Sequence, residues 1–223
     1  MLSLATTPVH SATLGSQLYS PWPSDALSDF LRSAGKLVTY ERDEAIYHEG
    51  DASHYLFRVQ NGAVRICKFR IEGQRQIDAF YLPGDYFGFD MQQQCRFTAE
   101  ATTTSTLLVA DVASFLSPGL KAADFVSAVW KTALRDLHRS QDHSLLLGRN
   151  AHVRVLAFLH DIATRLKRTS TIELPMSRQD IADYLGLTIE TVSRTLSDLV
   201  RDGAIDLPSS RSIAFRSPVK GVQ

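Results

Sequence analysis

The chain has 223 residues, of which 44% are hydrophobic and 22% charged, which is typical of one large globular domain or two small ones. It contains no apolar run of about 18 residues and does not open with a basic patch before an apolar block, so we expect neither a membrane span nor a signal peptide. The net charge of zero hides an uneven distribution, with 13 basic and 16 acidic side chains in residues 1–147 against 11 and 8 in residues 148–223, and this local basic excess leaves DNA binding open.

The N-terminal part of the sequence predicts a tail and then a short helix. Residues 1–24 hold three prolines and no charged side chain, a composition typical of a loose tail. In residues 25–34, Leu27, Phe30 and Leu31 recur at helical spacing and predict one apolar face.

Residues 36–115 predict a β-roll. Short apolar runs alternate there with turn signals spaced roughly every 11 residues. The turn signals are Glu49-Gly50-Asp51, Asn61-Gly62, Glu72-Gly73 and Pro83-Gly84-Asp85. Short strands at this spacing indicate an antiparallel roll or barrel, and Asn61-Gly62 between two such runs predicts a β-hairpin.

Residues 119–147 predict one long helix, because apolar residues recur at helical spacing and no proline follows Pro118. A helix of about 28 residues spans about 42 Å, which is long for a small domain. We therefore expect its wide apolar stripe to form a homodimer seam, with packing on its own roll alone as the alternative. The expected seam consists of Phe125, Val129, Ala133, Leu137 and Leu145, with a second row of Val126, Trp130 and Leu134 beside it.

A further helix and a short strand precede the most informative segment. Asn150 can cap a helix that runs to about Thr169, and residues 171–175 can form a strand. The expected apolar face of this helix consists of Val153, Leu156, Ala157 and Leu166, with His160 or Ile162.

Residues 177–202 have the pattern of a helix-turn-helix. Ser177 and Asp180 are spaced for a capping box, and Gly186 ends the first helix. Thr188 caps the second helix, which buries Val192, Leu196 and Leu199 and departs from the usual pattern at Thr195. Ala182 and Gly186 are small enough for two helices to cross closely. Residues 204–217 then predict two strands around a turn at 208–211, the wing of a winged helix.

The outward face of the second helix carries the residues that we expect to contact bases: Ile189, Glu190, Ser193 and Arg194. Arginine offers a forked donor pair to guanine, and glutamate accepts from the amino group of cytosine. Glu190 and Arg194 are also spaced to form an ordinary ion pair on a solvated face, which is the alternative reading of that pair. We expect contacts to the DNA backbone from Arg178, Thr188, Thr191, Arg201 and Arg211, with simple solvation as an equal alternative for Arg211.

On the motifs EGD…NGAVRI…LPGDYFG, the long helix and LGLTIETVSR, the chain resembles the Crp–Fnr superfamily of bacterial regulators over about residues 25–220. The resemblance implies an α+β protein with four parts. They are a flexible tail (1–24), a cyclic-nucleotide-binding-like β-roll (25–117), a dimerisation helix (118–147) and a winged helix-turn-helix (148–223). It also implies that a homodimer reads an inverted repeat and contacts RNA polymerase. The set Glu190, Ser193 and Arg194 resembles the Fnr–FixK branch, which reads TTGA-N6-TCAA.

The effector residues of the superfamily are only partly matched. A cyclic-nucleotide pocket needs Gly-Glu and Arg-Ser pairs, whereas this chain has Gly88-Phe89-Asp90 and Arg96-Phe97-Thr98. Arg96 can hold a phosphate or serve at the surface. The iron–sulfur members use four cysteines, three near the N-terminus, and here no cysteine precedes Cys67. Haem members use a histidine, for which His10, His48 and His54 are the candidates, and a lone histidine is usually structural.

We therefore expect a regulator of the FixK type, controlling microaerobic or anaerobic respiration or nitrogen-fixation genes as an activator, without a bound cofactor or metal. The two cysteines, Cys67 and Cys95, are typical of reduced thiols and indicate a cytoplasmic protein. An effector-gated sensor with a small ligand or haem in the roll, such as a denitrification regulator, is the alternative. An enzyme with a cupin-like roll would need more histidines than His48 and His54 within the roll, so we expect no catalytic residues.

Overall fold

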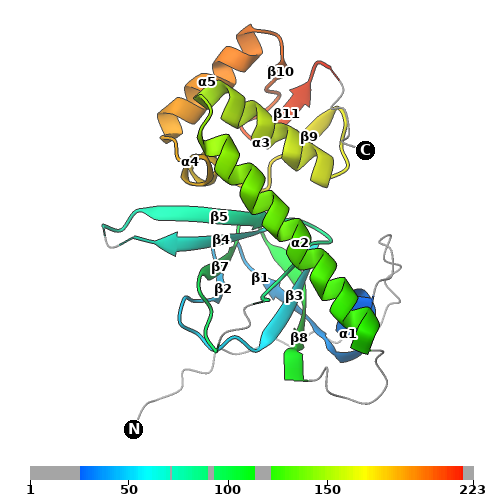
Figure 1. Ribbon diagram of the computed structural model, residues 1–223. Coiled ribbons are helices and arrows are strands. Elements are labelled where there is room, and N and C mark those ends of the chain that lie inside the picture. Colours follow the sequence, from blue (N-terminus) through cyan, green and yellow to red (C-terminus); the bar gives the residue numbers. More distant parts are fainter. Residues whose placement is uncertain (1–25, 71, 90–92, 114–121, 218–223) are drawn as a thin grey trace.

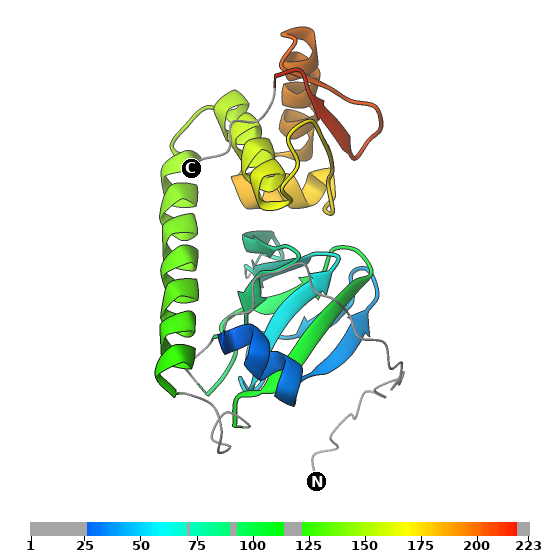
Figure 2. The same ribbon diagram turned by 90° about the vertical axis from the view of Figure 1, so that its right-hand side faces the viewer.

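The computed structural model describes residues 26–70, 72–89, 93–113 and 122–217 (Figure 1). Four features expected from the sequence lie outside these residues: the tail of residues 1–24, His10, Asp90 and the start of the long helix at 118–121. The described chain is an α+β protein in which a β-roll carries a long helix along one side and a smaller helical domain above it (Figures 1 and 2). The predicted fold class is confirmed.

The roll consists of one helix and two antiparallel sheets. Helix α1 (Ala26–Ala34) buries Leu27, Phe30 and Leu31, as predicted. The strands are β1 (Lys36–Tyr40), β2 (Ala45–Tyr47), β3 (Tyr55–Asn61), β4 (Val64–Phe69), β5 (Arg75–Tyr81), β6 (Tyr86–Phe87), β7 (Thr98–Ala101) and β8 (Ser105–Asp111). Their orders are β1-β8-β3-β6 and β2-β7-β4-β5, and the stacked rings of Phe57 and Phe87, 4.9 Å apart, lie in the core between the sheets.

The hairpin predicted at Asn61-Gly62 is wrong, because β3 and β4 belong to different sheets. Gly62 has the positive φ of a turn, +82°, but the Ser105 hydroxyl accepts the Ala63 N–H at 3.0 Å and holds the turn against the start of β8. The hairpin of this region is β4–β5, where Arg70 N–H donates to the Gln74 carbonyl at 2.8 Å. An Asn-Gly pair provides the turn geometry without deciding which strands pair.

The long helix and the smaller domain make up the rest of the chain. The elements are α2 (Ala122–Leu147), α3 (Ala151–Arg165), β9 (Thr171–Glu173), α4 (Arg178–Leu185), α5 (Ile189–Arg201), β10 (Ile205–Asp206) and β11 (Ser212–Phe215). The last three strands form a sheet of order β10-β11-β9, so the predicted strand and the predicted wing are both present. None of the described helices is long and apolar enough to cross a bilayer.

The buried face of α3 agrees with the predicted one in part: Ile162 is buried, and Leu156 and Leu166 pack against the core. Asn150 caps the helix as expected, accepting the Val153 N–H at 3.0 Å, but the Val153 side chain is 42% exposed. The buried side chains are Val155, Phe158, Leu159, Ile162 and Ala163. This helix is apolar over most of its circumference, so its sequence pattern alone does not select the face that packs.

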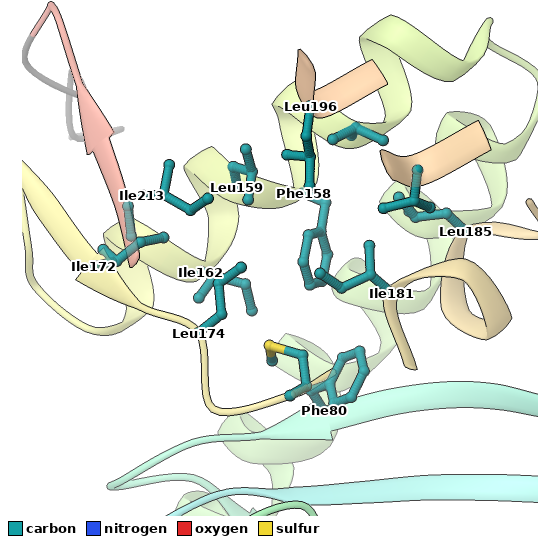
Figure 3. Packing of buried hydrophobic residues seen from close by; sticks show 14 of the residues in the cluster. Phe80, Phe158, Leu159, Ile162, Ile172, Leu174, Ile181, Leu185, Leu196 and Ile213 are labelled. Atoms are coloured by element: carbon teal, nitrogen blue, oxygen red, sulfur yellow. The ribbon is translucent and has the colours of Figure 1, made fainter. Parts of the chain in front are cut away.

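One hydrophobic cluster joins the roll to the smaller domain. Phe80 of β5 reaches up from the roll toward Phe158 (Figure 3), and the two ring centres are 6.0 Å apart. The ring of Tyr184 lies 5.2 Å from that of Phe80. Ile181 of α4 and Leu82 of the roll belong to the same buried cluster. The core of the smaller domain is therefore completed by side chains of the roll.

Candidate nucleic-acid interface

The predicted helix-turn-helix is formed by α4 and α5. The Ser177 hydroxyl accepts the Asp180 N–H at 3.1 Å, and the Asp180 carboxylate accepts the Ser177 N–H at 2.8 Å. Gly186 ends α4 at φ +61°, a left-handed backbone conformation that residues other than glycine rarely adopt. Thr188 caps α5, and its Oγ1 accepts the Thr191 N–H at 3.2 Å. All of these capping residues lie where the sequence predicts.

Helix α5 has one buried and one exposed face. The buried face consists of Val192, Thr195, Leu196 and Leu199. Thr195, the predicted departure, is only 6% exposed and takes its place among the apolar side chains. The exposed face of the first two turns consists of Ile189, Glu190 and Arg194, with Ser193 half-buried at its edge. The structure therefore brings the four expected base-contacting residues together at the start of one helix.

Glu190 is a fully exposed carboxylate whose pKa is lowered. Hydrogen bonds from its own backbone N–H and from the Thr188 hydroxyl are the main causes, and the charge of Arg194 contributes least. The carboxylate is thus held as an ionised acceptor by the helix N-terminus rather than by a close pairing with Arg194. A fully exposed carboxylate in the first turn of α5 fits both the expected base contact and the ordinary ion pair with Arg194.

The expected backbone-contacting residues surround this face. Arg178 is half-buried and donates from Nη1 to the Ser193 hydroxyl at 3.3 Å, so it also orients one of the side chains that we expect to contact bases. Arg201 shares the angular position of Arg194 but lies seven residues, or about 10 Å, further along the axis. Its guanidinium bonds to Asp198 at 2.8 Å. Arg211 lies in the turn of the β10–β11 wing.

Helix α4 is fixed to the roll by a buried ion cluster. Asp180 accepts from Arg65 at 3.0 Å and from Arg75 at 2.6 Å, and its side chain is 3% exposed. Arg75 also bonds to Asp183 at 2.8 Å, and Arg65 to Glu100 at 2.7 Å. Burial alone would raise the pKa of Asp180, but its bonds to Ser177 and the two arginine charges lower it. Asp180 therefore completes the capping box of α4 and also fixes that helix to the roll.

Sequence reasoning missed this cluster. Arg65 and Asp180 are separated by 115 positions, and neither belongs to a motif that points to the other. The only local signal is that Arg65 interrupts an apolar strand run, which equally fits an edge position.

The predicted dimer seam is divided between two faces of α2. Phe125 and Val129 pack against the roll of their own chain, where the Phe125 ring meets that of Phe30 at 5.4 Å. Ala133, Leu137 and Leu145 lie on the exposed side of the helix. The large apolar side chains that remain exposed on α2 are Val126, Trp130, Leu134, Leu137 and Leu145. No other described element covers the outer side of α2 in Figure 2.

The residues that align with the cyclic-nucleotide motifs of the roll, Gly88, Arg96 and Thr98, make contacts within the chain. The Thr98 hydroxyl accepts the Glu49 N–H at 3.1 Å, and Arg96 is exposed with its guanidinium 5.5 Å from the Phe97 ring. A Cβ at Gly88 would clash with Tyr55 and Phe57.

The expected metal and cofactor candidates are dispersed. His48 and His54 are exposed, and no group of three potential metal-binding side chains occurs among the described residues. Burial raises the pKa of the Cys67 thiol to about 12, so it is an unreactive core group.

Two family models match the two halves of the chain. "Bacterial regulatory proteins, crp family" matches residues 174–205, which include α4 and α5, and "Cyclic nucleotide-binding domain" matches residues 37–117 of the roll. The "Nitrogen fixation regulation protein FixK" of Azorhizobium caulinodans is 37% identical over 238 residues, covering 96% of each protein. The protein of the same name in Rhizobium meliloti is 39% identical over 183 residues, covering 82% of this chain and 83% of its own. The solved structure of FixK2 from Bradyrhizobium japonicum has a TM-score of 0.78 and 38% identity, covering 82% of this chain and 93% of that one.

Proposed function

Because the chain belongs to the Crp–Fnr family of DNA-binding transcription regulators and resembles its FixK proteins, we propose that it binds inverted repeats of the form TTGA-N6-TCAA as a homodimer. The proposed targets are genes of microaerobic or anaerobic respiration or of nitrogen fixation, which it activates. The observation that carries this proposal is that exposed Glu190 and Arg194 and half-buried Ser193 lie together on one side of the first two turns of α5. These turns are the part of a recognition helix that enters the major groove.

Each side chain on this face has a role that its chemistry supports. Arg194 donates two hydrogen bonds to the guanine of TTGA, and Glu190 accepts from a cytosine amino group on the opposite strand. Ser193 contacts a thymine methyl or a base edge, oriented by Arg178, and Ile189, which is 37% exposed, contacts a thymine methyl. The backbone contacts of the proposal come from Arg178, Thr188, Thr191, Arg201 and Arg211.

The proposed homodimer forms through the exposed apolar row of α2. Trp130 and Leu145 are 65% and 74% exposed, which is unusual for large apolar side chains along one helix. A parallel pair of α2 helices would place two α5 helices about one DNA turn, near 34 Å, apart, which is the reason for an inverted repeat. Double-stranded DNA and RNA polymerase are the other proposed partners.

We further propose that DNA binding needs no iron–sulfur cluster, haem or cyclic nucleotide. The support comes from residues that are present: Thr98 uses its hydroxyl for Glu49, and Cys67 lies buried in the core with a raised pKa. The roll then serves as a scaffold that docks α4 through Arg65 and Arg75.

The direct test measures binding by the full-length protein, purified in air, to a labelled duplex carrying TTGA-N6-TCAA. We expect a specific complex without added cyclic AMP, and binding weaker by roughly ten- to a hundredfold when one guanine is replaced, since a base contact is worth about 1–3 kcal/mol. Transcription with purified RNA polymerase should rise on a promoter with the intact site. A requirement for anaerobic purification or cyclic AMP, or equal affinity for both duplexes, would contradict the proposal.

A further inference from the structure

A cavity of about 280 Å³ lies where the roll, α2 and the end of α3 meet. Its walls carry five basic side chains and one acidic one: Arg58, Arg135, Arg139, Arg165, Lys167 and Asp85. Arg58 alternates along β3 with Phe57 and Val59, which point into the core between the two sheets. The cavity is therefore on the outer side of that sheet, away from the interior of the roll.

The single carboxylate in the cavity, that of Asp85, already has three hydrogen-bond partners within the chain. Asp85 accepts from Arg165 at 2.8 Å, from Arg139 at 3.0 Å and from the Leu82 N–H at 2.9 Å. Burial alone would raise the pKa of Asp85, but the charges of Arg165 and Arg139 lower it and keep it ionised. The same two arginines bond to further acids, Arg165 to Asp161 at 3.2 Å and Arg139 to Asp136 at 3.4 Å. These pairs account for Arg139 and Arg165, whereas Arg58 forms no ion pair within the described part of the chain.

Arg58 is the buried cation of this site. It is 2% exposed, and its Nε and Nη1 have no hydrogen-bond partner within the described part of the chain. Its guanidinium lies 5.5 Å from the centre of the Tyr86 ring, a cation–π contact that satisfies neither N–H group. A buried charge without a counter-charge is costly, so such a group in a cavity indicates a site for an anion.

We propose that this cavity binds a phosphoryl group, either as inorganic phosphate or as part of a small phosphorylated molecule. A guanidinium matches the geometry of phosphate oxygens with paired N–H donors, and the cavity is near the lower limit of small-ligand sites. Arg58 forms the floor, and Arg135 with Lys167 adds positive charge at the rim. The inference goes beyond the proposed function, because base recognition by α5 does not require this ligand.

The position of the site predicts what occupancy would do. Its walls come from β3, from the turn between β5 and β6, from α2 and from the residues around the end of α3. A bound phosphoryl group would therefore contact the roll, α2 and the DNA-binding domain at the same time. If the phosphoryl group favours one arrangement of these parts, it changes the affinity for DNA, and DNA changes the affinity for the phosphoryl group by the same factor.

The experiment uses the full-length protein and follows thermal unfolding and titration calorimetry in inorganic phosphate, or in ribose 5-phosphate, against sodium chloride of equal ionic strength. We expect a saturable rise in the unfolding temperature with phosphate and none with chloride. Tighter binding of ribose 5-phosphate assigns the site to a phosphorylated small molecule, and equal binding assigns it to the free anion.

Two variants and a matched control locate the site. Arg58→Met and Arg135→Gln should abolish the saturable shift, whereas Lys131→Gln, one turn away on the same helix, should keep it. In chloride alone Arg58→Met should unfold at the same or a higher temperature than the parent, since it removes an uncompensated buried charge. If Arg58→Met does not fold, Arg135→Gln and the calorimetry decide. A wild-type protein indifferent to phosphate, or full binding by both variants, would overturn the proposal.

Discussion

Arg194 and Arg201 share one stripe of α5, yet they lie in different surroundings. Arg194 is exposed beside Glu190 within the first two turns, where a helix meets base edges. Arg201 ends the helix and bonds to Asp198 at 2.8 Å and Asp202 at 3.9 Å. Their positions along the helix axis, rather than their angular positions, are the basis for the proposed base contact of Arg194 and the proposed backbone contact of Arg201.

The substitution Arg194→Ala should therefore remove discrimination at the guanine of TTGA. Fluorescence anisotropy on the intact duplex and on one with the guanine replaced should show binding to the intact site weaker by roughly ten- to a hundredfold, from a loss of about 1–3 kcal/mol. Binding to the altered site should change far less.

Arg201→Ala is the matched control at the other end of the helix. It should weaken binding to both duplexes alike and reduce the salt dependence, because a phosphate contact carries no sequence information. The recognition face would have to lie elsewhere if Arg194→Ala still distinguished the intact duplex from the altered one. The same would follow if Arg201→Ala alone lost that distinction.

Local sequence signals predicted individual elements well, and contacts between elements poorly. Ser177, Gly186 and Thr188 were readable because a helix cap is decided within four residues. The Asn61-Gly62 turn was found, but its hairpin was wrong because Ser105, 43 positions further on than Gly62, decides where the turn packs. The Arg58 cavity was not predictable either, since its walls come from four separate segments.

The amphipathic pattern of α2 shows the same limit. Two apolar rows were read correctly as a wide stripe, but the sequence does not say which row meets the roll. In the structure α1 covers Phe125 and Val129, and Val126, Trp130 and Leu137 stay exposed, which is where we propose that a second copy of the chain packs.

The dimer prediction belongs to this element. Trp130→Glu should give a folded monomer by light scattering at micromolar concentration, because a carboxylate in an apolar seam is strongly disfavoured. Its affinity for the inverted repeat should fall as well. Val129→Glu should instead lower the unfolding temperature, since Val129 packs within its own chain.

Lys131→Glu, which adds an acid at an exposed position next to Trp130, should leave the dimer intact. A wild-type protein that stays monomeric with and without DNA, or a Trp130→Glu variant that remains dimeric, would refute the seam.

At the scale of the whole molecule, the DNA-binding domain is held to the roll by both polar and apolar contacts. Asp180 accepts hydrogen bonds from Arg65 and Arg75. Phe80 packs on Phe158 (Figure 3) and on Tyr184. These contacts between the roll and the DNA-binding domain therefore fix the orientation of the helix-turn-helix in the described chain.

Arg65→Met should lower the free energy of unfolding by about 3–5 kcal/mol, because it leaves the buried carboxylate of Asp180 and the partly buried carboxylate of Glu100 short of a partner. The control is Lys68→Met on the same strand, which removes an exposed pair with Glu49 and should cost about 0–1 kcal/mol. Urea denaturation of both variants tests the difference, and equal losses would contradict a docking role for Arg65.

The same cluster predicts an acid-dependent loss of stability. The pKa of Asp180 is lowered in the folded protein, so its contribution is present above the ordinary aspartate pKa and is lost as pH falls through the folded value. In Arg65→Met the folded pKa of Asp180 should rise toward the ordinary value, so the acid-dependent loss of stability should be smaller and should be complete at a higher pH. Urea denaturation repeated across an acid pH series measures this, and an unchanged profile in the variant would contradict it.

The apolar bridge at Phe80 limits how such regulators can exchange parts. A recombinant that joined residues 148–223 to a foreign N-terminal half would lose Phe80 and Leu82 from beneath Phe158 and Ile181. The grafted half would then expose an apolar surface that the native chain covers. Viable chimaeras must therefore inherit β5 and its turn from the same parent as α3 and α4, which places the workable crossover point inside the roll and not at the linker after α2.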